Sequence, residues 1–149
     1  MIQIRKANTN DAHTIALMVA KLLTELEGKS FEQHSFTNAV KECMDTDLYT
    51  VFLAFSENEE CIGIVSVSLS RAVYAGGTFG IIQELYVQPE MRSLKIGQKL
   101  IKTIIDYGVN QQWKRIEVGA PNPLNWQRTI DFYEREGFTA IGPRLKMVL

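Results

Sequence analysis

An apolar strand, an amphipathic helix and a second strand follow one another in this chain, and this order constrains the fold more than any other feature. Residues 79–88 are almost continuously apolar, which is typical of a strand covered on both faces. Residues 96–113 place isoleucine and leucine at helical spacing, and residues 115–120 return to a strand pattern. Two strands joined by a crossover helix lie parallel, with a right-handed connection. The sequence therefore predicts a parallel strand pair.

The other predicted elements surround this pair. A first helix has an N-cap at Thr9 or Asn10 with Asp11, and it closes at Gly28. Further helices are expected over residues 31–45 and 127–136, and further strands over residues 2–7, 49–55, 61–69, 138–141 and 145–149. We predict one α/β (α+β) domain over residues 1–149. Its sheet is mixed and mostly antiparallel, has helices on both faces, and holds the parallel pair in its middle.

The composition excludes several classes of protein. The formal net charge of −1 gives no overall attraction to nucleic acid or acidic membranes, so any phosphate site must be local. Residues 1–6 lead directly into polar sequence without a signal-peptide core, and no apolar stretch approaches the ~20 residues of a membrane span. Cys43, Cys61, His13 and His34 have no metal-ligand spacing. We expect a cytoplasmic protein that binds no metal, nucleic acid or membrane.

The loop after the buried strand is suited to binding phosphate. The N–H groups of a helix N-terminus attract phosphate, and here they follow the carboxyl end of that strand. Arg92, Lys95, Lys99 and Lys102 recur at spacings of three and four and share one helical face. A solvated basic stripe is the simpler interpretation of such a face. Arg92, however, precedes the helix, and Gly97 lets a ligand approach the backbone.

Residues 89–97 resemble the pyrophosphate-binding signature of the GNAT superfamily, the acyl-CoA-dependent N-acyltransferases. That signature is R/Q-x-x-G-x-G/A. Arg92 stands at its first position and Gly97 at its last, whereas Lys95 replaces the first glycine. The lysine either weakens the packing of the pyrophosphate or supplies a compensating contact with its ammonium group.

Residues 132–138, Phe-Tyr-Glu-Arg-Glu-Gly-Phe, are similar to a second element of that family, F/L-Y-E-x-x-G-F. Packing of Phe132 and Tyr133 in the core is the alternative interpretation. The family often has an asparagine just upstream, and Asn125 lies one residue out of that register. The two motifs occur in the family's order, separated by a strand. The resemblance covers nearly the whole chain, although residues 8–48 match only as a helical pattern.

The resemblance implies a site for acetyl-CoA. In the family the two parallel strands splay apart, the pantetheine arm pairs with the exposed edge of the first strand, and a backbone N–H faces the thioester carbonyl. Here that edge is residues 85–87, with Tyr86 or Val87 as the amide donor, and the pyrophosphate would lie on residues 92–98. The residues expected to bind the cofactor are Leu85, Tyr86, Val87, Arg92, Ser93, Leu94, Lys95, Ile96, Gly97, Gln98, Asn125 and Tyr133.

The resemblance also assigns two catalytic residues. Glu84 stands where many family members carry a glutamate that removes the proton of the attacking amine, and most alkyl amines are protonated at neutral pH. The alternative is a structural carboxylate, or one that only holds a cationic substrate. Tyr133 matches the tyrosine that protonates the leaving thiolate.

Three functions remain open. The first is an N-acetyltransferase that moves acetyl from acetyl-CoA to a primary amine by direct attack in a ternary complex. The second is a non-catalytic acyl-CoA sensor, which Lys95 favours, and the third is an unrelated α/β domain. The acceptor is a small molecule or a peptide or protein amine, contacted by residues 24–36, 70–79 and 121–127. The oligomeric state is also open, although pairing of end strands into homodimers is common among proteins that resemble this chain.

Overall fold

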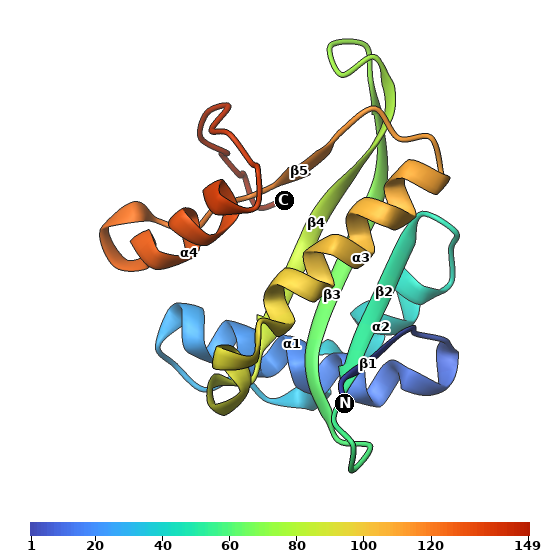
Figure 1. Cartoon of the computed structure of the whole chain (residues 1–149), viewed down its shortest axis with the longest axis vertical. Helices are drawn as coiled ribbons and strands as arrows, with labels where there is room; N and C mark the ends of the chain where they lie inside the picture. The colour runs from blue at the N-terminus through green and yellow to red at the C-terminus, as the bar shows by residue number, and fades with distance from the viewer.

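The computed structural model describes residues 1–149 and contains one five-stranded sheet in the order β1-β2-β3-β4-β5 (Figure 1). The strands are β1 Gln3–Lys6, β2 Tyr49–Phe55, β3 Cys61–Ala72, β4 Gly77–Val87 and β5 Ile116–Val118. β1 to β4 pair antiparallel, and β5 pairs parallel to β4. The helix α3 (Ile96–Asn110) provides the crossover between β4 and β5. The predicted α+β class and its parallel pair are confirmed.

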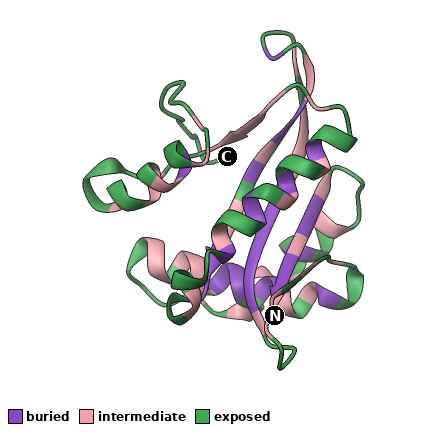
Figure 2. Cartoon of the chain, in the orientation of Figure 1, coloured by how far each residue is buried: buried purple, intermediate pink, exposed green.

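Helices cover both faces of the sheet. The helices α1 (Ala12–Glu27) and α2 (Thr37–Met44) bury one apolar cluster against the sheet, and α3 buries a second cluster on the opposite face. Figure 2 shows the buried positions along the middle of the sheet and on the inner sides of these helices. Short 3₁₀ turns precede three helices: η1 (Thr9–Asp11), η2 (Gln33–Phe36) and η3 (Pro89–Leu94). None of the helices is both long and apolar enough to cross a bilayer.

A capping box at Asn8, one residue earlier than the expected N-cap, holds η1, the turn that leads into α1. The Asn8 side chain accepts from the amide of Asn10, and the Asp11 carboxylate accepts from the amide of Asn8 at 2.8 Å. Arg5 on β1 donates two hydrogen bonds of 2.8 Å to Asp11. These bonds to Arg5 lower the pKa of Asp11 more than burial raises it. Gly28 ends the helix at φ 70°, as its position predicts.

A β-bulge interrupts β4 beside the parallel pair. Ser66 faces Glu84 and Val67 faces Ile82, so Gln83 is an extra residue in the ladder. β4 pairs with β5 only from Gly80 to Ile82, and the rest of β4 has no partner on that side. The two strands diverge in Figure 1, with β5 running toward α4. The sequence resemblance anticipates this splay.

The end of the chain differs from the prediction. The helix α4 (Pro123–Arg135) begins four residues earlier than expected, and the strands predicted over residues 138–141 and 145–149 are absent. β5 is therefore an edge strand, and the parallel pair lies at the edge of the sheet rather than in its middle. A three-residue strand followed by two prolines offers too short an edge for a further ladder. The apolar side chains of this segment remain exposed, namely Ile141, Leu145, Met147, Val148 and Leu149.

Candidate active site

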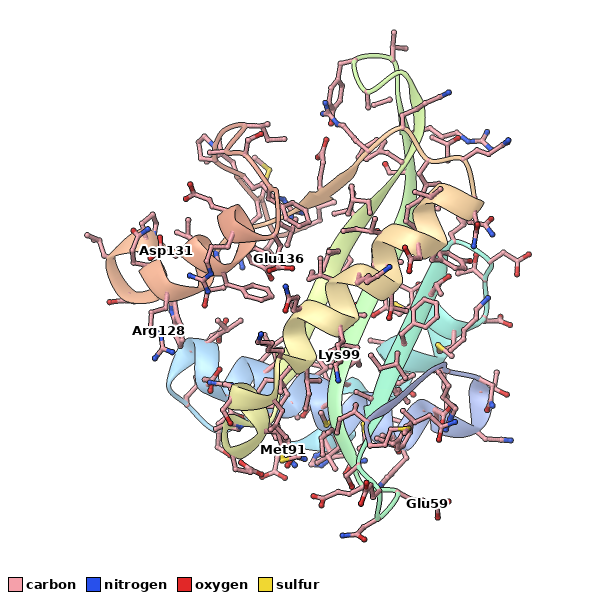
Figure 3. The ribbon with its side chains drawn as sticks, in the orientation of Figure 1. Glu59, Met91, Lys99, Arg128, Asp131 and Glu136 are labelled. Carbon is pink, nitrogen blue, oxygen red and sulfur yellow. The ribbon has the colours of Figure 1, made fainter.

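A cavity of about 1140 Å³ opens where β4 and β5 part. Its walls come from the end of α1, the second half of β4, the start of α3, the loop after β5 and α4. Figure 3 shows Arg128 and Glu136 on the side of α4 toward α1 and α3, with Asp131 pointing away. A space of this size, between a strand edge and a helix N-terminus, can hold an extended molecule.

The cavity includes most of the residues expected to bind acetyl-CoA. The nine that line it are Leu85, Tyr86, Val87, Arg92, Lys95, Gly97, Gln98, Asn125 and Tyr133. Ser93 and Leu94 are exposed outside its lining, and Ile96 is fully buried in the core. Lys99 and Lys102, the outer part of the basic face, do not line it either. The basic face is therefore divided, with only its first part next to the cavity.

The backbone at Lys95 has the conformation that a glycine would adopt. Lys95 has φ 59° and ψ 27°, which is the left-handed region, and it is the N-cap residue of α3. The position thus keeps the turn of the family signature although its glycine is replaced. The turn leads directly into the first residues of α3, whose N–H groups have no partner within a helix. Gly97 and Gln98 bring these groups to the cavity wall.

Arg92 connects three elements at the same end. Its Nη2 donates to both carboxylate oxygens of Glu25 on α1, at 2.7 and 2.9 Å, and its Nε donates to the carbonyl of Val87 at 2.9 Å. The guanidinium carbon also lies 5.7 Å from the ring centre of Tyr86. Arg92 therefore joins α1 to the end of β4. Sequence motifs could not reveal Glu25 as the partner of Arg92, because 67 residues separate the two.

Charged residues of α4 extend the basic character of the cavity. Arg128 and Arg135 line it together with Arg92 and Lys95, against the carboxylates of Glu25 and Glu136. Cationic side chains thus outnumber carboxylates in a chain whose formal net charge is −1. The sequence pattern of α4 did not single out its arginines, because charges on a short surface helix are common. Their common position next to the cavity favours an anionic ligand.

The two sequence motifs meet in space. A Cβ placed on Gly97 would lie 3.3 Å from the ring of Phe132, so the missing side chain lets α4 approach α3. Tyr133 is only 8% exposed, and burial raises its pKa to about 12. Its hydroxyl makes no hydrogen bond, yet no fully buried polar atom lacks a partner, so this oxygen is open to the cavity. The tyrosine is a proton donor that stays protonated at neutral pH.

Glu84 lies beside the cavity rather than in its lining. It is on the α1 and α2 side of β4, where its Oε1 accepts from the hydroxyl of Tyr49 at 2.5 Å and from the hydroxyl of Ser66. Its Oε2 makes no hydrogen bond. Burial, followed by the charge of Glu84, raises the pKa of Cys43 on α2. The sequence placed Tyr49 and Ser66 in strands but did not reveal them as partners of Glu84.

Comparison with known proteins identifies the family. The model of the acetyltransferase (GNAT) family matches residues 16–138, which is most of the chain. The chain belongs to the GNAT acetyltransferase family. The resemblance seen in the sequence is therefore confirmed.

Individual relatives are distant. The chain is 28% identical over 100 residues to an aminoalkylphosphonate N-acetyltransferase of Salmonella typhimurium. The aligned region covers 66% of this chain and 61% of that protein. A transcriptional regulator from Bacillus halodurans has the same fold, with a TM-score of 0.84, 22% identity and full coverage of both chains. An aminoglycoside acetyltransferase from an uncultured soil sample gives a TM-score of 0.78 at 18% identity, covering 99% and 95% of the chains. These structural likenesses show the fold alone.

Proposed function

We propose that this GNAT protein transfers acetyl from acetyl-CoA to a primary amine by direct attack in a ternary complex. The observation that carries the proposal is the cavity at the β4–β5 splay, which has a basic end at the start of α3 and the open hydroxyl of Tyr133. The family implies acetyl-CoA as the cosubstrate. The residues present fit it, because a basic helix N-terminus and a free strand edge are the two partners that a diphosphate and an amide-bearing arm require.

The diphosphate would bind where η3 turns into α3. Gly97 and Gln98 supply amide donors there, and Lys95 and Arg92 add positive charge. The pantetheine arm would pair with β4 beyond Ile82, where the strand has no partner on the β5 side. A backbone N–H of Tyr86 or Val87 would donate to the thioester oxygen as it gains charge.

Two side chains would move protons. Glu84 would take the proton of the amine, directly or through one water, with the Oε2 that no protein group occupies. Tyr133 would donate to the sulfur as the C–S bond breaks, because its raised pKa keeps it protonated. The acetyl carbon forms its new bond to nitrogen, and the thiol leaves with a proton.

The acceptor would be a small primary amine. The relative from Salmonella typhimurium is named for aminoalkylphosphonates and a structural neighbour for aminoglycosides, so both classes belong in a first panel. Peptide N-termini and polyamines complete it. Release of free thiol from acetyl-CoA with each amine identifies the substrates.

The test compares the full chain with two variants on the best amine. Glu84→Gln is expected to lower kcat by about 10²-fold or more, and Tyr133→Phe by a smaller factor, because each removes one proton-transfer group. Calorimetry with CoA should show that both variants still bind it. Binding of CoA without thiol release over the whole panel would instead favour the acyl-CoA sensor, and no binding at millimolar CoA would refute the site.

The exposed end of the chain supports a homodimer. Leu145, Met147 and Val148 are 95%, 84% and 84% exposed, which is unusual for large apolar side chains close together. We propose that this segment packs on a second copy. Leu145→Lys should then reduce the mass measured by sedimentation to that of one chain, whereas Val73→Lys, at a 99% exposed loop position, should leave it unchanged. A single-chain mass of the unmodified protein would contradict the dimer.

A further inference from the structure

Three side chains from neighbouring strands meet on the α1 and α2 face of the sheet. Tyr49 lies on β2, Ser66 on β3 and Glu84 on β4. Both hydroxyls donate to the same carboxylate oxygen, Oε1 of Glu84. The backbone amide of Glu84 donates in turn to the hydroxyl oxygen of Ser66 at 3.0 Å. Ser66 therefore fixes both the main chain and the side chain of Glu84, at the position where the bulge re-directs β4.

The surroundings partly shield this arrangement from solvent. Ser66 is 0% exposed, and Tyr49 is half-buried. Burial raises the pKa of Tyr49 far above its ordinary value, and the nearby charge of Glu84 raises it further. The phenol is therefore a permanent donor at any pH at which an enzyme works. Cys43 on α2 is the other titratable group facing the carboxylate, and its pKa is raised as well, so it stays a neutral thiol.

We propose that Tyr49 and Ser66 are positioning residues that hold the Glu84 carboxylate by Oε1 and leave Oε2 to accept the proton of the substrate amine. The inference rests on the proposed function, in which Glu84 is the base. Two donors on one oxygen fix the carboxylate in a single orientation. The Oε2 atom makes no hydrogen bond within the chain, and the neighbours of Glu84 in the strand, Gln83 and Leu85, line the cavity.

The test measures kcat and both KM values for Tyr49→Phe, Ser66→Ala and Glu84→Gln. Tyr49→Phe keeps the ring and removes one charge-assisted hydrogen bond, so we expect kcat to fall about tenfold. The KM for acetyl-CoA should not change, because neither hydroxyl lines the cavity.

A double variant isolates the positioning role. In the Glu84→Gln background the added Tyr49→Phe change should have no further effect on kcat, because both act through one group. Tyr107→Phe is the matched control: its hydroxyl lies 3.5 Å from Thr50 Oγ1, away from Glu84, and its kinetics should match those of the unmodified chain. Thermal unfolding of each variant shows whether it is folded.

Two results would overturn the inference while leaving the proposed function intact. One is an unchanged kcat in both folded single variants when Glu84→Gln is slow. The other is a Tyr49→Phe effect of equal size with and without Glu84. If Glu84→Gln itself retained full kcat, the assignment of the base would fail, and the positioning role would fail with it.

Discussion

Lys95 provides a quantitative test of the turn that leads into α3. A residue with a Cβ in the left-handed region is destabilised by about 1–2 kcal/mol, whereas glycine adopts this region freely. Glycine also has more freedom in the unfolded chain, which offsets about 0.5–1 kcal/mol of the gain. Lys95→Gly should therefore raise the free energy of unfolding by about 0.5–1 kcal/mol. For a chain of 149 residues this corresponds to a rise in Tm of about 2 °C.

Thermal and urea unfolding, followed by circular dichroism, measure this change. Lys95→Ala is the control, because it removes the ammonium group but keeps the Cβ in the left-handed region. Any gain from removing a positive charge near a helix N-terminus appears in both variants. Only the difference between them reports the backbone conformation. Equal stability of the alanine and glycine variants would refute the reasoning.

Three further predictions concern the cavity and the core. Glu25→Gln should tighten the binding of CoA several-fold, measured by calorimetry, because Arg92 loses the carboxylate that competes for its guanidinium. Gly80→Ala should lower the free energy of unfolding by about 1–3 kcal/mol, since the new Cβ would overlap the Trp113 ring. Asp11→Asn should lower stability at neutral pH, and its urea midpoint should change less than that of the unmodified chain as the pH falls below about 4.

The sign of the last effect follows from the depressed pKa of Asp11. The charged Asp11 stabilises the folded chain at pH values above the pKa that this carboxyl has in the unfolded chain. This stabilisation is lost as the pH falls through the lower pKa of Asp11 in the folded chain. Asp106→Asn is the control, because Asp106 pairs with Lys102 on an exposed helix face. Glu27→Gln is the control for CoA binding, as Glu27 lies on the same helix without touching Arg92. Equal effects in a variant and its control would contradict the corresponding prediction.

Periodicity predicts the parts of this fold whose cause is local. The buried strand, the helix after it and the first helix up to Gly28 follow from spacing and caps, and the structure has them within a few residues. The prediction of two strands at the end of the chain is wrong for a physical reason. Residues 138–149 contain strand formers, but a strand exists only if an edge accepts it, and β5 ends at Val118.

The residues of the candidate site also fall into two groups, those that local sequence predicts and those that it does not. The turn at Lys95, Gly97 and the Tyr133 helix could be found because each motif is continuous in sequence. The partners of Glu84 could not, because Tyr49 and Ser66 are 35 and 18 residues away and become neighbours only through the register of the sheet. No residue type identifies a bulge position such as Gln83 in a sequence. The register of the strand, and the face of the sheet on which Glu84 lies, therefore cannot be predicted from sequence.

Gln83 divides β4 into two segments of opposite phase. Side chains of a strand alternate, so one inserted residue exchanges the inner and outer sets beyond it. Ile82 points toward α3, and after Gln83 it is Glu84 and Tyr86 that point toward α1. If Gln83 were an ordinary ladder residue, regular alternation from Ile82 would place the acid in the apolar layer under α3, with the composition of the strand unchanged. The bulge, as much as the chemistry of the strand, keeps the carboxylate on the side where an amine could reach it.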